Sequence, residues 1–541
     1  MNSRKWRKSL RRSIVPIALL WGVMFLGWLA LNSQDAGGRP LTILWGADPE
    51  MFDPQRTSNA VAADVFRHVC EPLFFDGDGE VGGLLAEDEW MVSEDGLRVT
   101  ITIRSGITFH DGARLDALAV QKSFERLQRL GASPLLNDLR QVNVEAQPDG
   151  MSVQFTLPEP DYEFVRFVLS NPYAAIVSPH ATDEVAAGFV ACTGPYQFRR
   201  ELYRPQETLT LTRYRSYRWP PALFANQGPA HVPQLRFVFE AERAERLAAL
   251  MAGEGCVLSL SQEDLDQAAS LPQMRLYTAS GGVIYLGFNF QKARWQDLRA
   301  RQAVALALDK TALAAAGPFA VLDTPLAPNA AGYDPAVASA GYAFDPAQSR
   351  GLLSQAGQDY GQAITLLIPE SATYRTLAAL VQQQLEAAGL GPVQVREKPR
   401  SRLLNERQDF DLLLFDYAWA DYAALSIFLG PGPRNLLNYA QGDIAGWIRQ
   451  ARATANPTLR QQLINQAQRA VLEQAIWQPL LTRRITFAVH GACLAGERQS
   501  PYGELLFHDA DTAPRYRGSL GYESTEGLYL VVLVKSILYI A

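Results

Sequence analysis

The first strongly apolar stretch of the chain follows a cluster of cations. Residues 4–12 carry six lysines and arginines and no acid, and residues 14–31 form an apolar run. A run of this length can cross ~30 Å of hydrocarbon at about 1.5 Å of rise per residue, and a positive flank stays on the cytoplasmic side. Residues 1–37 are therefore predicted to form a signal peptide or membrane anchor, and the rest of the chain is expected outside the cytoplasm. No convincing small-x-small cleavage motif follows Leu31, which favours an uncleaved anchor over the alternative of a cleaved signal.

Farther along the chain, short apolar runs alternate with amphipathic stretches. Residues 41–45 and 99–103 have the apolar pattern of strands. From residue 364 onward the pattern predicts strand 364–368, helix 373–388, strand 393–395, helix 402–407 and strand 411–415. This order predicts a parallel sheet with right-handed crossovers, and therefore an α/β fold.

The segment that follows the last predicted strand is rich in acids and aromatic rings. Residues 416–422 read DYAWADY. Ligands of open parallel sheets bind beyond the carboxyl ends of the strands, and carboxylates beside rings suit an organic cation or a free amino group. The predicted ligand-binding residues here are Asp421, Trp419, Tyr422 and Tyr417. The competing interpretation is that the rings pack a loop while Asp416 or Asp421 caps the next helix.

The charge balance narrows the classes of function. Of 541 residues, 50 are Lys or Arg and 56 are Asp or Glu, which gives a net charge of −6, and 48% are hydrophobic. These are the proportions of a folded chain, and the length predicts about two to four domains. A net anion gains nothing from a phosphate backbone, so nucleic acid is not an expected partner.

Cysteines and histidines give no sign of catalysis or metal binding. The four cysteines lie far apart and form no CxxC pair, so we expect isolated buried thiols rather than disulfides or a zinc site. Neither H-E-x-x-H nor G-x-S-x-G occurs among the scattered histidines and serines. No catalytic residue, metal ligand or cofactor is therefore predicted. The acidic segment 76–82 (DGDGEVG) only partly fits a phosphate or calcium loop, and a hairpin turn is expected there.

Five segments, in chain order, resemble those of one protein family. They are residues 70–96, 99–127, 192–198, 209–219 and 285–310. The most specific is 99–127 (VTITIRSGITFHDGARLDALAVQKSFERL), in which a strand precedes Phe-His-Asp-Gly and a helix. Together they resemble the family 5 extracellular solute-binding proteins, which include the dipeptide- and oligopeptide-binding proteins of ABC importers. The resemblance covers about residues 41–518, and this chain departs from the family pattern at Ala119, Cys192, Arg294 and Trp295.

The resemblance implies a bilobed, periplasmic-binding-protein-like α/β fold of type II, with two hinge crossovers and an extra sub-lobe. Lobe I is expected to span residues 38–288, with the sub-lobe at about 61–175. Lobe II would span 289–484, and 485–518 would return to lobe I, with crossovers near 283–289 and 483–489. Residues 519–541 form an apolar tail of unknown role, and its last 15 residues, from Gly527, are short for a membrane span.

The resemblance also implies a function without catalysis. The chain is expected to be an extracytoplasmic monomer, in the periplasm or on the outer face of the cytoplasmic membrane. It would capture a small organic solute, a peptide or another amine-bearing compound, between its lobes and deliver it to ABC transporter permease subunits. Asp421 matches the aspartate that pairs with the peptide amine in this family, although Trp419 is one residue too close to it. Asn289 matches a family asparagine and is added to the predicted site.

Two alternatives from other classes remain open at this point. The first is a membrane-anchored bilobed sensor or scaffold that passes ligand to a signalling partner. The second is a secreted hydrolase, which the missing catalytic motifs disfavour.

Overall fold

The computed structural model covers most of the chain between residues 40 and 512. The described ranges are 40–56, 60–77, 80–131, 133, 135–181, 189–240, 242–260, 262–356, 360–405, 409–418, 421–432, 434–500 and 503–512. The predicted anchor (1–37), the apolar tail (519–541) and Trp419 lie outside these residues. Within the described ranges no helix combines the length and the apolar character needed to span a membrane.

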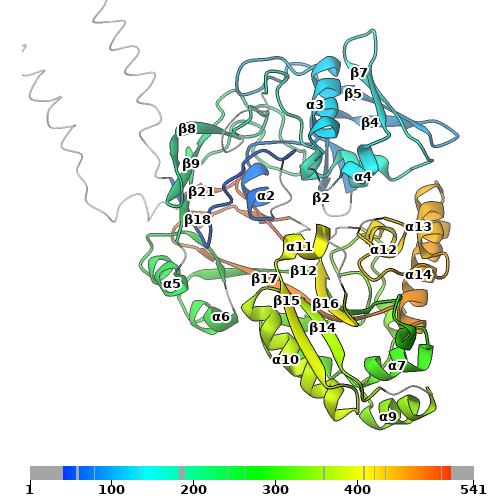
Figure 1. The fold of residues 1–541 in the computed structure, drawn as a ribbon. Coiled ribbons are helices and arrows are strands. Elements are labelled where there is room, and N and C mark those ends of the chain that lie inside the picture. The colour runs from blue at the N-terminus through cyan, green and yellow to red at the C-terminus, as the bar shows by residue number, and fades with distance from the viewer. Residues whose placement is uncertain are drawn as a thin grey trace, which may run out of the picture.

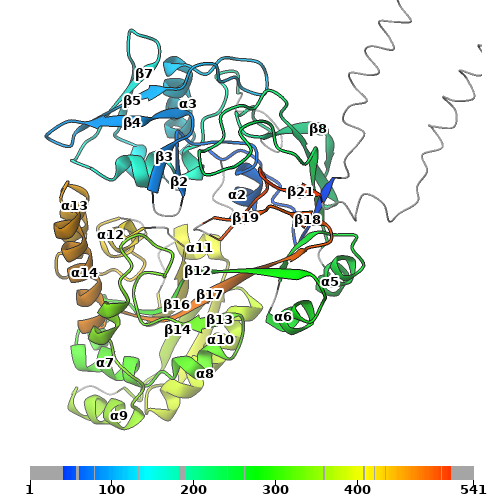
Figure 2. The same cartoon turned by 180° about the vertical axis from the view of Figure 1, so that it is seen from behind.

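Buried hydrophobic residues in the described part of the chain form four clusters, which define three bodies. Lobe II is built mainly on residues 283–481, the sub-lobe mainly on residues 73–176, and the rest of lobe I on two clusters from residues 41–70, 175–268 and 487–510. Figure 1 shows lobe I and the sub-lobe above lobe II, and Figure 2 shows the same arrangement from behind. The chain therefore folds as two lobes with an additional sub-lobe, as the resemblance implies.

One large sheet belongs to both lobes. Its strands follow the order β15-β14-β16-β12-β17-β11-β1-β10-β9-β8, and β13 pairs with β17. The lobe I strands are β1 (Leu41–Trp45), β8 (Tyr196–Arg204), β9 (Thr208–Arg213), β10 (Gln234–Phe239) and β11 (Val257–Leu260). The helices beside them are α2 (Ala60–Phe66), α5 (Arg243–Met251) and α6 (Gln262–Ala269). β18 (Leu494–Ala495), β19 (Arg498–Gln499), β20 (Leu505–Leu506) and β21 (Asp511–Thr512) complete lobe I.

The lobe II end of the sheet is the parallel unit predicted from the hydrophobic pattern. β14 (Ile364–Pro369) lies between β15 (Val393–Lys398) and β16 (Leu412–Tyr417) and runs parallel to both. α10 (Ala372–Ala387) and α11 (Arg400–Asn405) make the crossovers. The other lobe II elements are α7 (Leu298–Leu306), α8 (Lys310–Ala314), β13 (Phe319–Val321), α9 (Pro346–Gln355), α12 (Ala423–Leu429), α13 (Ile444–Arg452) and α14 (Pro457–Glu473).

The sub-lobe holds a separate four-stranded sheet covered by one helix. The order is β4 (Ala86–Val92), β5 (Arg98–Ile103), β7 (Ser152–Thr156) and β6 (Asn143–Ala146). α3 (Ala117–Leu130) begins at Asp116, whose carboxylate accepts from the Ala119 amide, and ends at Gly131 with a φ of 66°. The predicted hairpin at 76–82 is confirmed, because β2 (Phe74–Gly77) pairs with β3 (Glu80–Gly83). A short helix, α4 (Leu136–Leu139), follows α3.

Two long strands connect the lobes. β12 (Met274–Phe288) and β17 (Trp477–His490) pair along nearly their whole length, and both predicted crossovers fall on them. β17 pairs with β11 of lobe I, and β12 pairs with β16 of lobe II. The register shifts between Ser280 and Val283, where Gly282 has a φ of 86°. A Cβ at Gly282 would lie 2.4 Å from the carbonyl oxygen of Tyr417, so only glycine fits this irregularity.

The expectation of isolated thiols is wrong, because all four cysteines form disulfides. Cys70 pairs with Cys192 at a Cα–Cα distance of 4.9 Å, and Cys256 pairs with Cys493 at 5.6 Å. The two cysteines of each pair are 122 and 237 residues apart, so their spacing along the chain does not predict the pairing. Cys256 precedes β11 and Cys493 follows β17, and the pairing of these two strands brings the two thiols together. Disulfides persist in oxidising compartments, which agrees with export.

Candidate functional site

The carboxyl end of β16 leads directly to the predicted binding segment at the junction of the lobes. Asp421 precedes α12, and its side chain is buried, with 5% of the residue surface exposed. Its Oδ1 accepts a 2.5 Å hydrogen bond from the backbone amide of Ala423. The competing interpretation of Asp421 as a helix cap thus describes one real contact of this carboxylate.

Burial makes Asp421 an unusual acid. It raises the pKa of this carboxyl to about 7, while the nearby Arg452 guanidinium and the Ala423 amide act in the opposite direction. Asp138 and Asp161 of the sub-lobe raise this pKa further. Among the described residues no lysine or arginine forms an ion pair with Asp421, so a buried, titratable carboxylate stands between the lobes without a direct cation.

Two of the predicted aromatic residues, Tyr422 and Tyr417, are buried in lobe II. The Tyr422 ring meets the sub-lobe ring of Phe167 edge to face, with centroids 5.3 Å apart. The Tyr422 hydroxyl is buried and has no hydrogen-bond partner in the described part of the chain. The Tyr417 ring stacks on Phe428 of α12 at 4.8 Å, and its hydroxyl donates to the Pro325 carbonyl. Tyr422 therefore has a hydroxyl without a hydrogen-bond partner among the described residues, whereas Tyr417 is held in the lobe II core by its ring and its hydroxyl.

Asn289 lies far from the other predicted site residues. β12 runs antiparallel to β16, so Val283 stands opposite Tyr417 while Phe288 stands opposite Leu412. Five residues of strand separate the two ends by about 16 Å. Asn289 follows Phe288, its amide donates to the Phe410 carbonyl at 2.9 Å, and its oxygen accepts from Asn438 and from the Gln291 amide. Asp421 and Tyr422 are thus neighbours at the lobe junction, Tyr417 ends the strand that leads to them and packs on Phe428, and Asn289 ties loops at the opposite edge.

Asp416 has a structural environment. The Tyr374 hydroxyl donates to its carboxylate, and Arg400 donates to the same group at 2.6 Å. Arg400 also covers the Phe415 ring, with the guanidinium carbon 4.4 Å from the ring centroid. This carboxylate therefore fastens the first turns of α10 and α11 to the end of β16.

A second group of charged residues at the lobe junction was not predicted from the sequence. Arg452 of α13 bonds Asp138 at 2.8 Å and Asp161 at 2.5 Å, both in the sub-lobe. Arg460 of α14 bonds Glu163 at 2.8 Å. Partners of this kind lie about three hundred residues apart, at 314 and 291 residues for the two Arg452 pairs, and no local pattern joins them.

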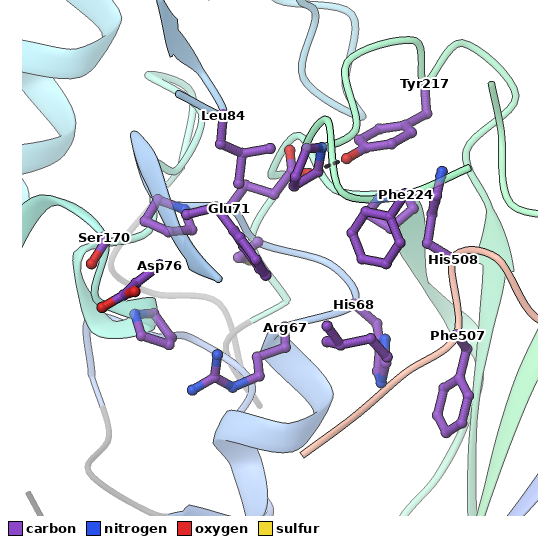
Figure 3. Close-up of a pocket in the computed structure, with 17 residues that line it drawn as sticks. Arg67, His68, Glu71, Asp76, Leu84, Ser170, Tyr217, Phe224, Phe507 and His508 are labelled. Carbon is purple, nitrogen blue, oxygen red and sulfur yellow. Dashed lines mark hydrogen bonds between the residues drawn. The ribbon is translucent and has the colours of Figure 1, made fainter. Parts of the chain in front are cut away.

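A small pocket of about 70 Å³ lies within lobe I, at the boundary with its sub-lobe. Figure 3 shows rings of Phe224, Phe507 and Tyr217 around it, together with Glu71 and His508. All of its lining residues come from 67–84, 170–224 and 506–508, so lobe II contributes none. The pocket is therefore separate from the junction that holds Asp421.

Glu71 in the wall of this pocket joins three of the segments that carry the family resemblance. Its carboxylate accepts hydrogen bonds from Tyr217 at 2.5 Å, Trp219 at 3.0 Å and Thr193 at 2.9 Å. Burial raises its pKa to about 7, against the effect of these donors. These segments thus share a structural role, because they hold one buried acid in lobe I.

A two-lobed α/β chain with two connecting strands and a buried carboxylate at the lobe junction has the architecture of a solute-binding protein. The sequence profile of the bacterial extracellular solute-binding proteins, family 5 (middle region), matches residues 80–431. The chain therefore belongs to this family, whose members are extracytoplasmic binding proteins rather than enzymes.

Individual relatives align with this protein along almost the whole chain. The glutathione-binding protein GsiB of Salmonella paratyphi A is 26% identical over 505 residues, covering 87% of this chain and 94% of its own. GsiB of Escherichia coli strain K12 is 25% identical over the same share of both chains. No residue role follows from these figures alone.

Solved structures share the fold. A dipeptide-binding protein from Pseudoalteromonas sp. SM9913, in complex with Met-Leu, superposes with a TM-score of 0.72 at 21% identity, covering 88% of this chain and 100% of its own. A putative peptide-binding protein, AppA, from Clostridium difficile gives 0.76 at 19% identity with the same coverage. NikA of Brucella suis, in complex with Fe(III)-EDTA, gives 0.74 at 22% identity, again with the same coverage.

Proposed function

We propose that this protein captures an amine-bearing solute, such as a short peptide, between its lobes and hands it to the permease subunits of an ABC importer. Asp421 would pair with the ammonium group of the solute, and Tyr422 would contribute its free hydroxyl. Tyr417 and Trp419 would supply apolar walls that exclude water. Asn289 would act only indirectly, through the loops that it ties.

The observation that carries the proposal is the charge at the lobe junction. Within the described residues, the four carboxylates of Asp138, Asp161, Glu163 and Asp421 meet three guanidinium groups, those of Arg452 and Arg460 in direct ion pairs and that of Arg166 near Glu163. A buried excess of negative charge is costly unless a cation joins it. An ammonium group from the solute would supply such a cation, and it would offset the cost of burial, which raises the pKa of Asp421 to about 7.

The names of relatives support the class of solute. Glutathione and Met-Leu, which appear in the names of two of the similar proteins, both carry a free amino group. The chemical nature of these compounds agrees with the excess of carboxylates at the junction. We therefore favour a peptide or peptide-like amine over a neutral solute.

The protein would work at the membrane surface as two lobes joined by a hinge. Residues 1–37 would hold the protein at the outer face of the membrane, next to the permease, and the protein would act as a monomer. Lobe I would comprise residues 38–288 and 485–518, and lobe II residues 289–484. β12 and β17 would flex near Ser280 and Arg483 when the lobes close.

A direct test is to recover the solute. The full-length protein, purified in mild detergent without added ligand, would be denatured and the released small molecules identified by mass spectrometry. We expect a compound with a free amino group, unchanged after prolonged incubation with fresh protein. A recovered compound without an amino group would contradict the amine assignment, and chemical turnover would contradict the binding-protein assignment.

A further inference from the structure

Arg452 is bound by the sub-lobe through both its side chain and its backbone. The guanidinium group bonds Asp138 at 2.8 Å and Asp161 at 2.5 Å, and its Nε also donates to Asp161 at 3.1 Å. The amide of Tyr162 donates to the Arg452 carbonyl at 2.9 Å. The Arg452 side chain is 17% exposed and that of Asp161 is 10% exposed. These contacts are largely withdrawn from water, so they are stronger and less screened than surface pairs.

The contacts around Arg452 lie on one side of the lobe junction. Arg460 bonds Glu163 at 2.8 Å, and the Tyr422 ring meets Phe167 at 5.3 Å. Figure 1 shows α13 and α14 at the outer end of lobe II, on the side that faces α4 of the sub-lobe, and Figure 2 shows the same two helices from behind. A rotation of the lobes about β12 and β17 would separate all of these pairs together.

We propose that Arg452 is an interlobe clasp, which forms its bonds to Asp138 and Asp161 when the lobes close and thereby completes the acidic site around Asp421. The part that concerns Asp421 rests on the proposed function, whereas the clasp itself does not. The clasp makes Arg452 a positioning residue, because it acts on the solute through the placement of the two lobes.

The count of charges explains why the clasp would respond to a cation. One guanidinium group serves two carboxylates of the sub-lobe and lies near a third, that of Asp421. Closure therefore gathers more negative than positive charge. A ligand shifts an equilibrium between two states only if it binds one of them more tightly. An ammonium group would bind the closed state more tightly, because only closure gathers the carboxylates whose charge it balances.

The experiment follows closure without any ligand. Hydrogen–deuterium exchange of the full-length protein in detergent reports on the Tyr162 amide, which is protected only while it is bonded to Arg452. In Arg452→Gln the peptide containing Tyr162 is expected to exchange about tenfold faster. Arg449→Gln is the matched control, because Arg449 lies on the same helix as Arg452 and is exposed to solvent. Peptides of β12 and β17 report whether each variant remains folded.

Two further arms decide the assignment. Asp161→Asn should raise exchange at Tyr162, and the double variant with Arg452→Gln should add little, because both changes break the same pair. In the parent protein 1 M salt should speed exchange at Tyr162, and this dependence should be smaller in Arg452→Gln. Equal exchange at Tyr162 in the parent and Arg452→Gln proteins overturns the clasp. Asp421→Asn should leave the protection of the Tyr162 amide intact. A failure of the amine assignment can therefore be told apart from a failure of the clasp.

Discussion

The carboxylate of Asp421 accepts a 2.5 Å hydrogen bond from the backbone amide of Ala423, at the first turn of α12. One oxygen thus bonds the first amide of the helix, while the proposed role of the carboxylate is to pair with a ligand at the lobe junction. Asparagine keeps a side-chain oxygen for the cap and removes the charge. Asp421→Asn therefore separates a role in folding from a role in recognition.

We expect Asp421→Asn to weaken binding of an amine ligand by on the order of 2–4 kcal/mol, because a buried ammonium group would lose its charged partner. Titration calorimetry with glutathione or Met-Leu, each compared with its N-acetylated form, measures the effect. The parent protein should prefer the free amine, and the variant should lose that preference. Equal affinity of the parent protein for both forms would remove the amine from the mechanism.

Asp416 provides the internal control for this experiment. Its carboxylate is already engaged by Arg400 and Tyr374. Asp416→Asn should lower the stability of lobe II while leaving the preference for a free amine unchanged. A loss of that preference in Asp416→Asn alone would place the ammonium site at Asp416.

The stability of the protein should also report the charge of Asp421. Its pKa rises from 3.8 to about 7 on folding because of burial, so the folded state holds a proton that the unfolded state releases. The loss of folding stability caused by ionising Asp421 is absent below about pH 4. It grows as the pH rises to about 7 and reaches at most about 4 kcal/mol. Asp421→Asn should therefore gain stability over the parent protein across this range in urea unfolding. A difference that does not change with pH would contradict the burial of this charge.

The comparison with the variant is needed because other buried groups titrate in the same range. Burial raises the pKa values of Asp64 and Glu71 to about 7, which adds the same slope. Burial lowers the pKa of His68 to about 3 and that of His110 to about 4. As the pH falls below about 6.5, these histidines take up protons in the unfolded state but not in the folded state, so the protein becomes less stable. Their contributions cancel in the difference between Asp421→Asn and the parent protein.

Gly282→Ala should destabilise the protein more than Gly112→Ala. Both glycines have a φ of 86°, which costs an alanine roughly 1–2 kcal/mol. A Cβ at Gly282 would also lie 2.4 Å from the Tyr417 carbonyl oxygen, whereas a Cβ at Gly112 would meet nothing within 4 Å. Urea unfolding of the two variants measures the extra cost of crowding at the connection between the lobes. Equal losses would show that this region relaxes freely.

Both disulfides should contribute to stability. Reduction, or replacement of Cys256 and Cys493 by serine, should lower the free energy of unfolding by about 2–5 kcal/mol for each bridge, since each closes a long loop. Thiol titration of the denatured protein should find no free thiol before reduction and all four afterwards. Free thiols in protein purified from the exported fraction would contradict the pairing.

Local pattern was sufficient for several parts of the fold. The alternation of apolar runs predicted the parallel unit of β14, β15 and β16, because hydrophobic periodicity follows the period of each element. The acidic glycine-rich segment predicted the β2–β3 hairpin, because turn residues act on their own backbone. The place of Asp421 after the last strand of the parallel unit was also visible, since it depends only on where that strand ends.

The sequence by itself thus determined the parallel unit of lobe II, one hairpin, the family and the position of one acid at a strand end. Only the tertiary structure decided which distant residues meet. Antiparallel pairing of β12 with β16 put Asn289 at the opposite edge from Asp421, and the pairing of β11 with β17 joined Cys256 to Cys493. Packing of the lobes brought Arg452 to Asp161 across 291 residues. These contacts depend on the direction and register of strands and on the docking of whole lobes, and spacing along the chain records neither.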